Sequence, residues 1–240
     1  MTAFITSSPF REDVDRPTFS NVNGFIDRIR TKLPEHPKCL YICSSPDRHD
    51  INCLYGADIF MAFANAGILF TSYQVLDDMN AHRAEELVAQ ADLIVLAGGH
   101  VPTQNAFFRR IRLRELLKNH PGVAMGISAG SMNAADVVYS QPEEPGESSP
   151  DFARFLPGLA LTKINILPHY QKEKDSVLDG KRLYEDITFA DSMGHTFYAL
   201  PDFSYVLSDG NGETIFGESY RLRDGQMEQL TYHGESLPIR

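Results

Sequence analysis

The first half of the chain alternates short apolar runs with longer segments of helical periodicity, and this alternation constrains the fold more than any other feature. The runs lack strict polar–apolar alternation, which is typical of strands buried on both faces. They lie at Ala3–Ser7, Lys38–Cys43, Ile68–Val75, Leu93–Leu96 and Val123–Gly126. The segments with helical spacing are Phe19–Leu33, Tyr55–Ala66, His82–Gln90 and Gln104–Leu117. Strands that alternate with helices predict a doubly wound, flavodoxin-like α/β fold with a mostly parallel sheet.

The second half follows a different pattern. Ala129–Asp136 has the length of a short helix, and the Pro-, Glu-, Gly- and Ser-rich stretch Ser140–Phe152 predicts a loop. A further helix is expected at Gly180–Ser192. Thr196–Leu230 contains short apolar runs separated by Asp-Gly and Asn-Gly turns, which favour antiparallel hairpins. We therefore expect one domain over residues 1–240, with C-terminal antiparallel strands appended to the parallel sheet.

Charge and hydropathy exclude several classes of protein. The formal net charge of −10 disfavours a nucleic-acid partner, which normally requires a basic face. No stretch approaches the ~20 apolar residues of a membrane span, and the first residues lack the pattern of a secretory signal. Cys39, Cys43 and Cys53 show no metal-ligand spacing, and we expect them to be reduced and structural. These observations predict a cytoplasmic protein without membrane contact, either a monomer or a homodimer.

The most informative segment is the turn after the fifth apolar run, where Gly126-Ile-Ser128-Ala-Gly130 matches a glycine–any–serine–any–glycine pattern. A sharp strand-to-helix turn exposes a serine hydroxyl above the sheet, and small neighbours keep the crowded backbone free of clashes. The following helix directs free N–H groups at the reaction centre. We therefore interpret Ser128 as a nucleophile and the amide of Ala129 as an oxyanion donor. A tight turn without chemistry is the alternative for so short a motif.

Two further segments end at the same expected edge of the sheet. The run Leu93–Leu96 leads to the pair Gly98-Gly99, which leaves a bare backbone amide where open α/β sheets build their sites. Gly99 N–H is the candidate for the second oxyanion donor, and His100 is expected to line the pocket. His169 follows an apolar run and a proline that stiffens the backbone, and it is the best candidate for the base.

The sequence does not identify which residue supplies the carboxylate that would orient the imidazole. A third group should hold the histidine and stabilise its cation. The helix and loop after the serine offer Asp136, Glu143, Glu144, Glu147 and Asp151. Most of these must be solvated acids without a catalytic role.

These motifs together resemble the peptidase E (aspartyl dipeptidase) family, which includes the cyanophycinases and has a class I glutamine amidotransferase-like fold. The resemblance covers essentially the whole chain. It rests on Gly126–Ser131, Leu167–Tyr170, the glycine pair and Phe197–Asp202. It implies a serine peptidase that cleaves a small peptide substrate, in one branch after an N-terminal aspartate, and that needs no metal or organic cofactor.

Carried over residue by residue, the resemblance implies nucleophile and base at Ser128 and His169, and oxyanion amides at Gly99 and Ala129. Counting on from the serine without gaps places the acidic member on Glu143. Glu144 and Glu147 stay open because the loop varies in length across the family. In the dipeptidase branch, a basic residue on the helix after the histidine would hold the carboxylate of an aspartyl substrate. Lys181 and Arg182 lie at about that place, and Arg182 could bind a carboxylate bidentately. Exposed surface charge is the alternative for both.

The sequence departs from the family pattern near the predicted pocket. His100 stands where family members often have asparagine, and Val101-Pro-Thr103 resembles an insertion before the next helix. Leu167-Pro168 replaces the Asp-Gln of cyanophycinases, which favours the dipeptidase branch. Two alternatives stay open, a non-catalytic binding protein on the same fold and an α/β-hydrolase esterase with the same turn motif.

Overall fold

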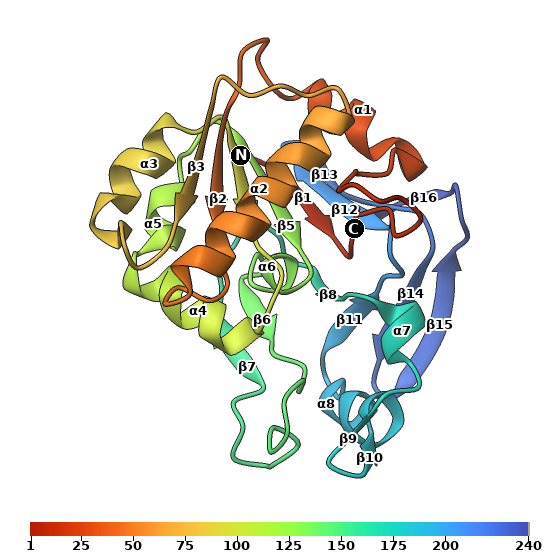
Figure 1. Ribbon diagram of the computed structural model, residues 1–240. Helices are drawn as coiled ribbons and strands as arrows, with labels where there is room; N and C mark the ends of the chain where they lie inside the picture. Colours follow the sequence, from red (N-terminus) through yellow and green to blue (C-terminus); the bar gives the residue numbers. More distant parts are fainter. Residues whose placement is uncertain (240) are drawn as a thin grey trace.

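The computed structural model describes residues 1–239, and its largest element is an eight-stranded sheet (Figure 1). The strand order is β16-β13-β12-β1-β5-β4-β2-β3. The last five of these strands run parallel, and the first three are antiparallel to their neighbours. The bounds are Thr2–Thr6 (β1), Lys38–Ile42 (β2), Ser72–Leu76 (β3), Leu93–Leu96 (β4), Val123–Ile127 (β5), Tyr205–Asp209 (β12), Gly212–Phe216 (β13) and Ser236–Ile239 (β16). The predicted fold class is confirmed.

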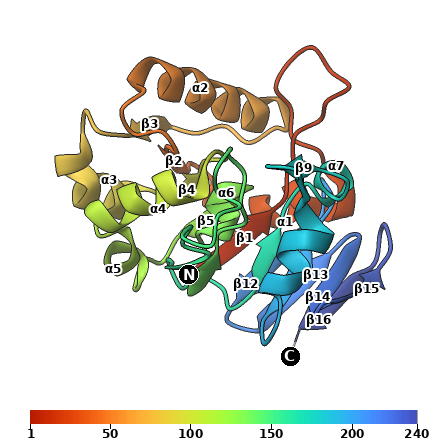
Figure 2. The ribbon, with the colours of Figure 1, turned by 90° about the horizontal axis from the view of Figure 1, so that it is seen from below.

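Helices cover both faces of the parallel strands. Figure 2 shows α2 on one side of β2 and β4, with α4 and α5 on the other side. Neighbouring side chains of a strand point to opposite faces, and in β1 the buried Phe4 belongs to one core cluster while Ala3 and Ile5 belong to another. The helices have the bounds Phe25–Arg30 (α1), His49–Asn65 (α2), Ala84–Gln90 (α3), Val101–Arg110 (α4), Leu113–Leu117 (α5) and Ala129–Met132 (α6).

Several boundaries differ from the sequence-based expectation for local reasons. The segment predicted as one helix over residues 104–117 is divided because Arg112 adopts a left-handed conformation with φ of 57°. Val101-Pro-Thr103, which resembled an insertion, forms the first turn of α4, where a proline is tolerated. The helix after Ser128 ends at Met132, earlier than predicted.

A second sheet of four strands lies beside the first and was not predicted. Its order is β15-β14-β11-β8, and β8 and β11 pair in parallel. Only part of the C-terminal region therefore extends the main sheet. In Figure 1 this second sheet lies next to the short helix α7. The bounds are Asn165–Leu167 (β8), Thr196–Ala199 (β11), Ser219–Arg223 (β14), Gln226–Thr231 (β15) and Tyr170–Glu173 (α7).

The segment predicted as a helix over residues 180–192 is also divided. Asp179 and Gly180 have φ of 50° and 78° and connect two short antiparallel strands. Asp-Gly is a preferred sequence for such a hairpin turn. The strands β9 and β10 and the helical turns that follow have the bounds Val177–Leu178, Lys181–Arg182, Leu183–Thr188 (a π-helical turn) and Phe189–Asp191 (α8). A further hairpin joins Val137–Tyr139 (β6) to Phe155–Pro157 (β7).

Residues that follow four different strands gather at one edge of the structure. Ser7 follows β1, Gly98-Gly99 follows β4, Ser128 follows β5 and His169 follows β8. The N–H groups of Ser128 and His169 both bond to Ser7. This is the carboxyl edge of the parallel sheet, where open α/β folds place their sites. Over residues 1–239, no helix is both long enough and apolar enough to cross a membrane.

Candidate active site

Ser128 occupies a sharp turn between β5 and α6, in a backbone conformation that few residues adopt. Its φ and ψ are 50° and −113°, outside the regions that L-residues favour. The N–H of Ser128 donates to the carbonyl oxygens of Thr6 at 3.2 Å and Ser7 at 3.0 Å. Its own carbonyl accepts the N–H groups of Ser131 and Met132. The predicted strand–turn–helix setting of Ser128 is present, and these bonds hold the strained turn in place.

The two glycines of the motif are required by close packing. A Cβ atom on Gly126 would lie 2.7 Å from the backbone of Ser131. One on Gly130 would lie 2.2 Å from the carbonyl oxygen of Leu96 on the neighbouring strand. Any side chain at either position would push α6 away from β4 and β5 and would move Ser128 with it.

Two backbone amides beside Ser128 are free to bind an oxyanion. Within residues 1–239, the N–H groups of Gly99 and Ala129 meet no backbone carbonyl. Ala129 is the first residue of α6, so its N–H has no acceptor within the helix. Gly99 has φ of 142°, and a Cβ atom there would lie 2.3 Å from Ser44 Oγ. Both residues line one cavity with Ser128, which is the setting that stabilisation of a tetrahedral oxyanion requires.

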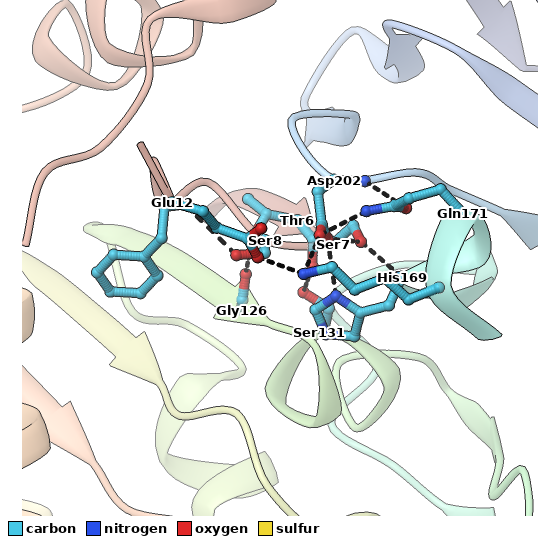
Figure 3. A network of polar contacts seen from close by, with 11 residues as sticks. Thr6, Ser7, Ser8, Glu12, Gly126, Ser131, His169, Gln171 and Asp202 are labelled. Atoms are coloured by element: carbon cyan, nitrogen blue, oxygen red, sulfur yellow. Dashed lines mark hydrogen bonds and ion pairs between the residues drawn. The ribbon is translucent and has the colours of Figure 1, made fainter. Parts of the chain in front are cut away.

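His169 lies at the end of β8 in a left-handed conformation, with φ of 57°. Its Nδ1 lies 2.7 Å from Oδ1 of Asp202 (Figure 3). A carboxylate at Nδ1 fixes the imidazole and leaves Nε2 as the nitrogen available for proton transfer. His169 lines the same cavity as Ser128.

The carboxylate at the imidazole therefore comes from Asp202, and not from Glu143, Glu144 or Glu147 as the sequence analysis expected. β8 and β11 are parallel neighbours. A Leu-Pro step at the end of β8 leads to His169, and a second one directly after β11 leads to Asp202. This repeated step is the sequence signal for the pair. Counting residues onward from the serine could not detect it, because a later strand delivers the partner.

Asp202 is held by groups on both of its carboxylate oxygens. Oδ1 accepts hydrogen bonds from His169 Nδ1 and from Ser7 Oγ at 2.9 Å, and Oδ2 accepts one from Gln171 Nε2 at 2.6 Å. Lys172 Nζ lies 3.1 Å from Oδ2. Burial raises the pKa of Asp202, but the hydrogen bond and charge of His169, followed by the bonds of Lys172 and Ser7, lower it to about 2. An ionised carboxylate is what stabilises an imidazolium.

Ser128 and His169 open onto a cavity of about 230 Å³. Its apolar wall is formed by Val101, Met132, Pro142, Val177, Leu178 and Leu183. Glu143 and Glu173 also line it, whereas no Lys or Arg of the described residues does. Apart from His169, the ionisable residues that line the cavity are thus acidic.

Glu143 lies at this cavity but makes no hydrogen bond to His169 within the described part of the chain. Partial burial raises the pKa of Glu143, the charge of His100 opposes this, and the neighbouring carboxylates of Glu147 and Glu144 raise it further. Its place in the wall of the cavity that Ser128 also lines suits contact with substrate better than support of the base.

His100 and Arg182, both predicted to bind substrate, do not line the cavity. His100 Nδ1 contacts Thr103 Oγ1 at 2.7 Å, and its Nε2 contacts Glu147 Oε1 at 2.8 Å. Glu147 in turn accepts the backbone N–H of Glu143 at 2.9 Å, which links His100 to a residue that lines the cavity. Arg182 is exposed and forms an ion pair with Asp186 at 2.8 Å.

One group of side chains has the ligand types of a metal site. Ligand atoms of His100, Glu144 and Glu147 lie within 4.8 Å of one another and could hold a divalent cation. Glu147 is already bonded to His100 and to the loop backbone, and we assign this cluster no catalytic role.

Comparison with known proteins gives a family and a fold. The sequence pattern of peptidase family S51 matches residues 10–215. A solved peptidase from an acI-B1 Actinobacterium superimposes with a TM-score of 0.65 at 18% identity, over 99% of this chain and 96% of the other. A putative peptidase E protein from Listeria monocytogenes EGD-e superimposes with a TM-score of 0.62 at 16% identity, over 96% and 98%. No curated protein matches the chain.

Proposed function

Because the chain belongs to peptidase family S51 and is therefore a serine-type peptidase, we propose that it cleaves short peptides through an acyl-enzyme on Ser128, with His169 and Asp202 completing the triad. The membership also confirms the resemblance to peptidase E that the sequence motifs indicated. The triad proposal is carried by the 2.7 Å contact between Asp202, which is half-buried, and His169, which lines the same cavity as Ser128.

The proposed reaction follows from the roles of these groups. His169 Nε2 takes the proton of the Ser128 hydroxyl as Oγ attacks the scissile carbonyl carbon. The N–H groups of Gly99 and Ala129 stabilise the oxyanion of the tetrahedral intermediate. The imidazolium, held by Asp202, then gives its proton to the leaving amine. Water, deprotonated by His169, attacks the acyl-enzyme, and the imidazolium returns that proton to Ser128 Oγ as the carboxylic acid product leaves.

The size of the cavity favours a small substrate. About 230 Å³ lies below the roughly 300–1,000 Å³ that is typical of pockets for drug-sized ligands. That space admits one or two side chains of a peptide. A folded protein would have to present a free terminus or an extended loop to reach Ser128.

The charge inside the cavity argues against the aspartyl specificity that the resemblance implied. Arg182, the residue expected to grip an aspartyl carboxylate, is paired with Asp186 outside the cavity. Glu143 and Glu173 would repel a second carboxylate in the same space. We therefore propose peptides with a neutral or positively charged residue at the scissile bond as the substrates.

A panel of dipeptides and matching esters tests this function on wild-type protein and Ser128→Ala. We expect peptide turnover by the wild type, loss of that turnover in the variant, and labelling of Ser128 by a fluorophosphonate reagent. Turnover of esters without peptides would favour the esterase alternative. A wild type that binds peptides but neither cleaves them nor reacts with the reagent would favour the binding protein.

A further inference from the structure

Ser7 contacts all three residues of the proposed triad, although it bears none of the predicted motifs. It follows directly after β1, the central strand between β5 and β12, and its relative exposure is 0%. Figure 3 shows its side chain between His169 and Asp202. A buried polar side chain normally satisfies its hydrogen-bonding capacity within the protein. The hydroxyl of Ser7 does so with His169 and Asp202.

The backbone of Ser7 anchors the nucleophile. Its carbonyl oxygen accepts the N–H of Ser128 at 3.0 Å, and its own N–H donates to the carbonyl oxygen of Ser204 at 3.2 Å. Ser128 is the strained residue of the turn, with φ of 50°. The position of Ser7 therefore contributes directly to the position of Ser128.

The hydroxyl of Ser7 bonds to the other two residues of the proposed triad, His169 and Asp202. Its oxygen accepts the backbone N–H of His169 at 2.7 Å and donates its hydrogen to Asp202 Oδ1 at 2.9 Å. The same Oδ1 atom receives His169 Nδ1 at 2.7 Å. A hydroxyl has one donor and two acceptor sites, so a single atom can serve both contacts. Alanine could serve neither.

We infer that Ser7 is a positioning residue that sets the imidazole of His169 against both Asp202 and Ser128. This rests on the proposed function of the triad. β8 and β11 belong to the second sheet, whereas Ser128 ends a strand of the main sheet. Ser7 is bonded to residues from both sheets, so it fixes their relative placement at the point where a proton must pass between them. Small displacements matter there, since a misplacement of about 1 Å can cost 10²-fold in rate.

Ser7→Ala tests the inference, with Ser219→Ala as the matched control. Ser219 is also fully buried and forms a single side-chain pair, with Thr231 Oγ1 at 2.6 Å, in the second sheet. We expect Ser7→Ala to lower kcat about 10- to 100-fold with KM little changed, and Ser219→Ala to leave kcat unchanged. Ser7→Cys keeps nearly the same volume with a much weaker donor, and its kcat should fall between those of the wild type and Ser7→Ala.

A spectroscopic measurement distinguishes an effect of Ser7 on the position of His169 from a general loss of stability. It also does not depend on the proposed peptidase activity. The low-field proton resonance of His169 Nδ1–H reports the bond to Asp202 without any turnover. It should shift in Ser7→Ala and stay in place in Ser219→Ala. An unchanged resonance together with an unchanged kcat in folded Ser7→Ala would overturn the inference, as would equal loss of kcat in both variants. If the wild type lacked peptide turnover, the proposed function would fail while the resonance still tested Ser7.

Discussion

His169 Nδ1 and Asp202 Oδ1 lie 2.7 Å apart, although 33 positions separate the two residues in the chain. The pair exists because β8 and β11 are parallel neighbours, with Leu167 opposite Ala199. The N–H of Leu200 continues this pairing by donating to the carbonyl oxygen of Leu167 at 2.9 Å. Two strands that end in register thus deliver a base and a carboxylate to the same place.

Asp202→Asn should lower kcat/KM by roughly 10³- to 10⁴-fold. The amide cannot stabilise an imidazolium, and it favours the wrong tautomer of the histidine. Asp186→Asn is the control, because it removes the same charge from an exposed residue that pairs only with Arg182. The measurement is kcat/KM on the best dipeptide of the panel. A loss below tenfold in Asp202→Asn would show that another group orients His169.

Asp202 should also make stability depend on pH at the acid end. Its pKa is about 2 in the folded protein, against 3.8 as the ordinary value. A carboxyl group whose pKa is lower in the folded state stabilises the fold at pH values above its unfolded-state pKa. This stabilisation is lost as pH falls through the folded-state pKa. Its contribution of up to about 2 kcal/mol, reduced by solvent screening because Asp202 is only half-buried, should therefore be complete above about pH 5 and be lost as pH falls through about 2.

Urea unfolding of the wild type and Asp202→Asn between pH 2 and pH 7 measures this contribution. The difference between their free energies of unfolding should be constant above about pH 5 and should shrink as pH falls below that. A difference that stayed constant down to pH 2 would mean that the low pKa does not contribute to stability.

Gly99→Ala should lower kcat by about 10²- to 10³-fold, the usual cost of losing one oxyanion donor. A Cβ atom would lie 2.3 Å from Ser44 Oγ at φ of 142°, so the backbone of residue 99 must move. Gly210→Ala is the control, since no heavy atom lies within 4 Å of a Cβ placed there. Retention of full kcat by Gly99→Ala would remove this amide from the proposed mechanism.

The main sheet was predictable because its strands are short, buried and separated by helices. The second sheet was not, since its parallel pair β8 and β11 depends on contacts between distant segments. One turn signal in the sequence also lies within a segment whose apolar spacing favours a helix. Asp179-Gly180 is a hairpin signal inside the segment predicted as a helix.

The site residues likewise differ in how far local sequence identifies them. Ser128, Gly99 and His169 follow apolar runs that can be recognised one at a time, and the structure brings them to one cavity. Asp202 also follows an apolar run and a proline, but its role is defined only by the neighbouring strand. Ser7 carries no motif, and only the fold places its hydroxyl between His169 and Asp202.

The charge of the cavity predicts which peptides are cleaved. Glu143 and Glu173 line it without any Lys or Arg of the described residues. Partly exposed pairs contribute up to about 1 kcal/mol each, so two carboxylates should favour a lysyl over an aspartyl dipeptide by about tenfold or more in kcat/KM. Raising the salt concentration should reduce this preference through screening.

The double variant Glu143→Gln with Glu173→Gln tests the source of that preference. Removing both charges should bring the lysyl-to-aspartyl ratio of kcat/KM close to one, while a neutral leucyl dipeptide is cleaved nearly as before. Glu85→Gln, an exposed position on α3 away from the cavity, should leave the ratio unchanged. N-acetylated lysyl dipeptides distinguish the two cations of the substrate, because they keep the side-chain charge and lose the terminal one. If the wild type preferred the aspartyl peptide, or if the ratio survived in the double variant, the carboxylates of the cavity would not be what selects the substrate.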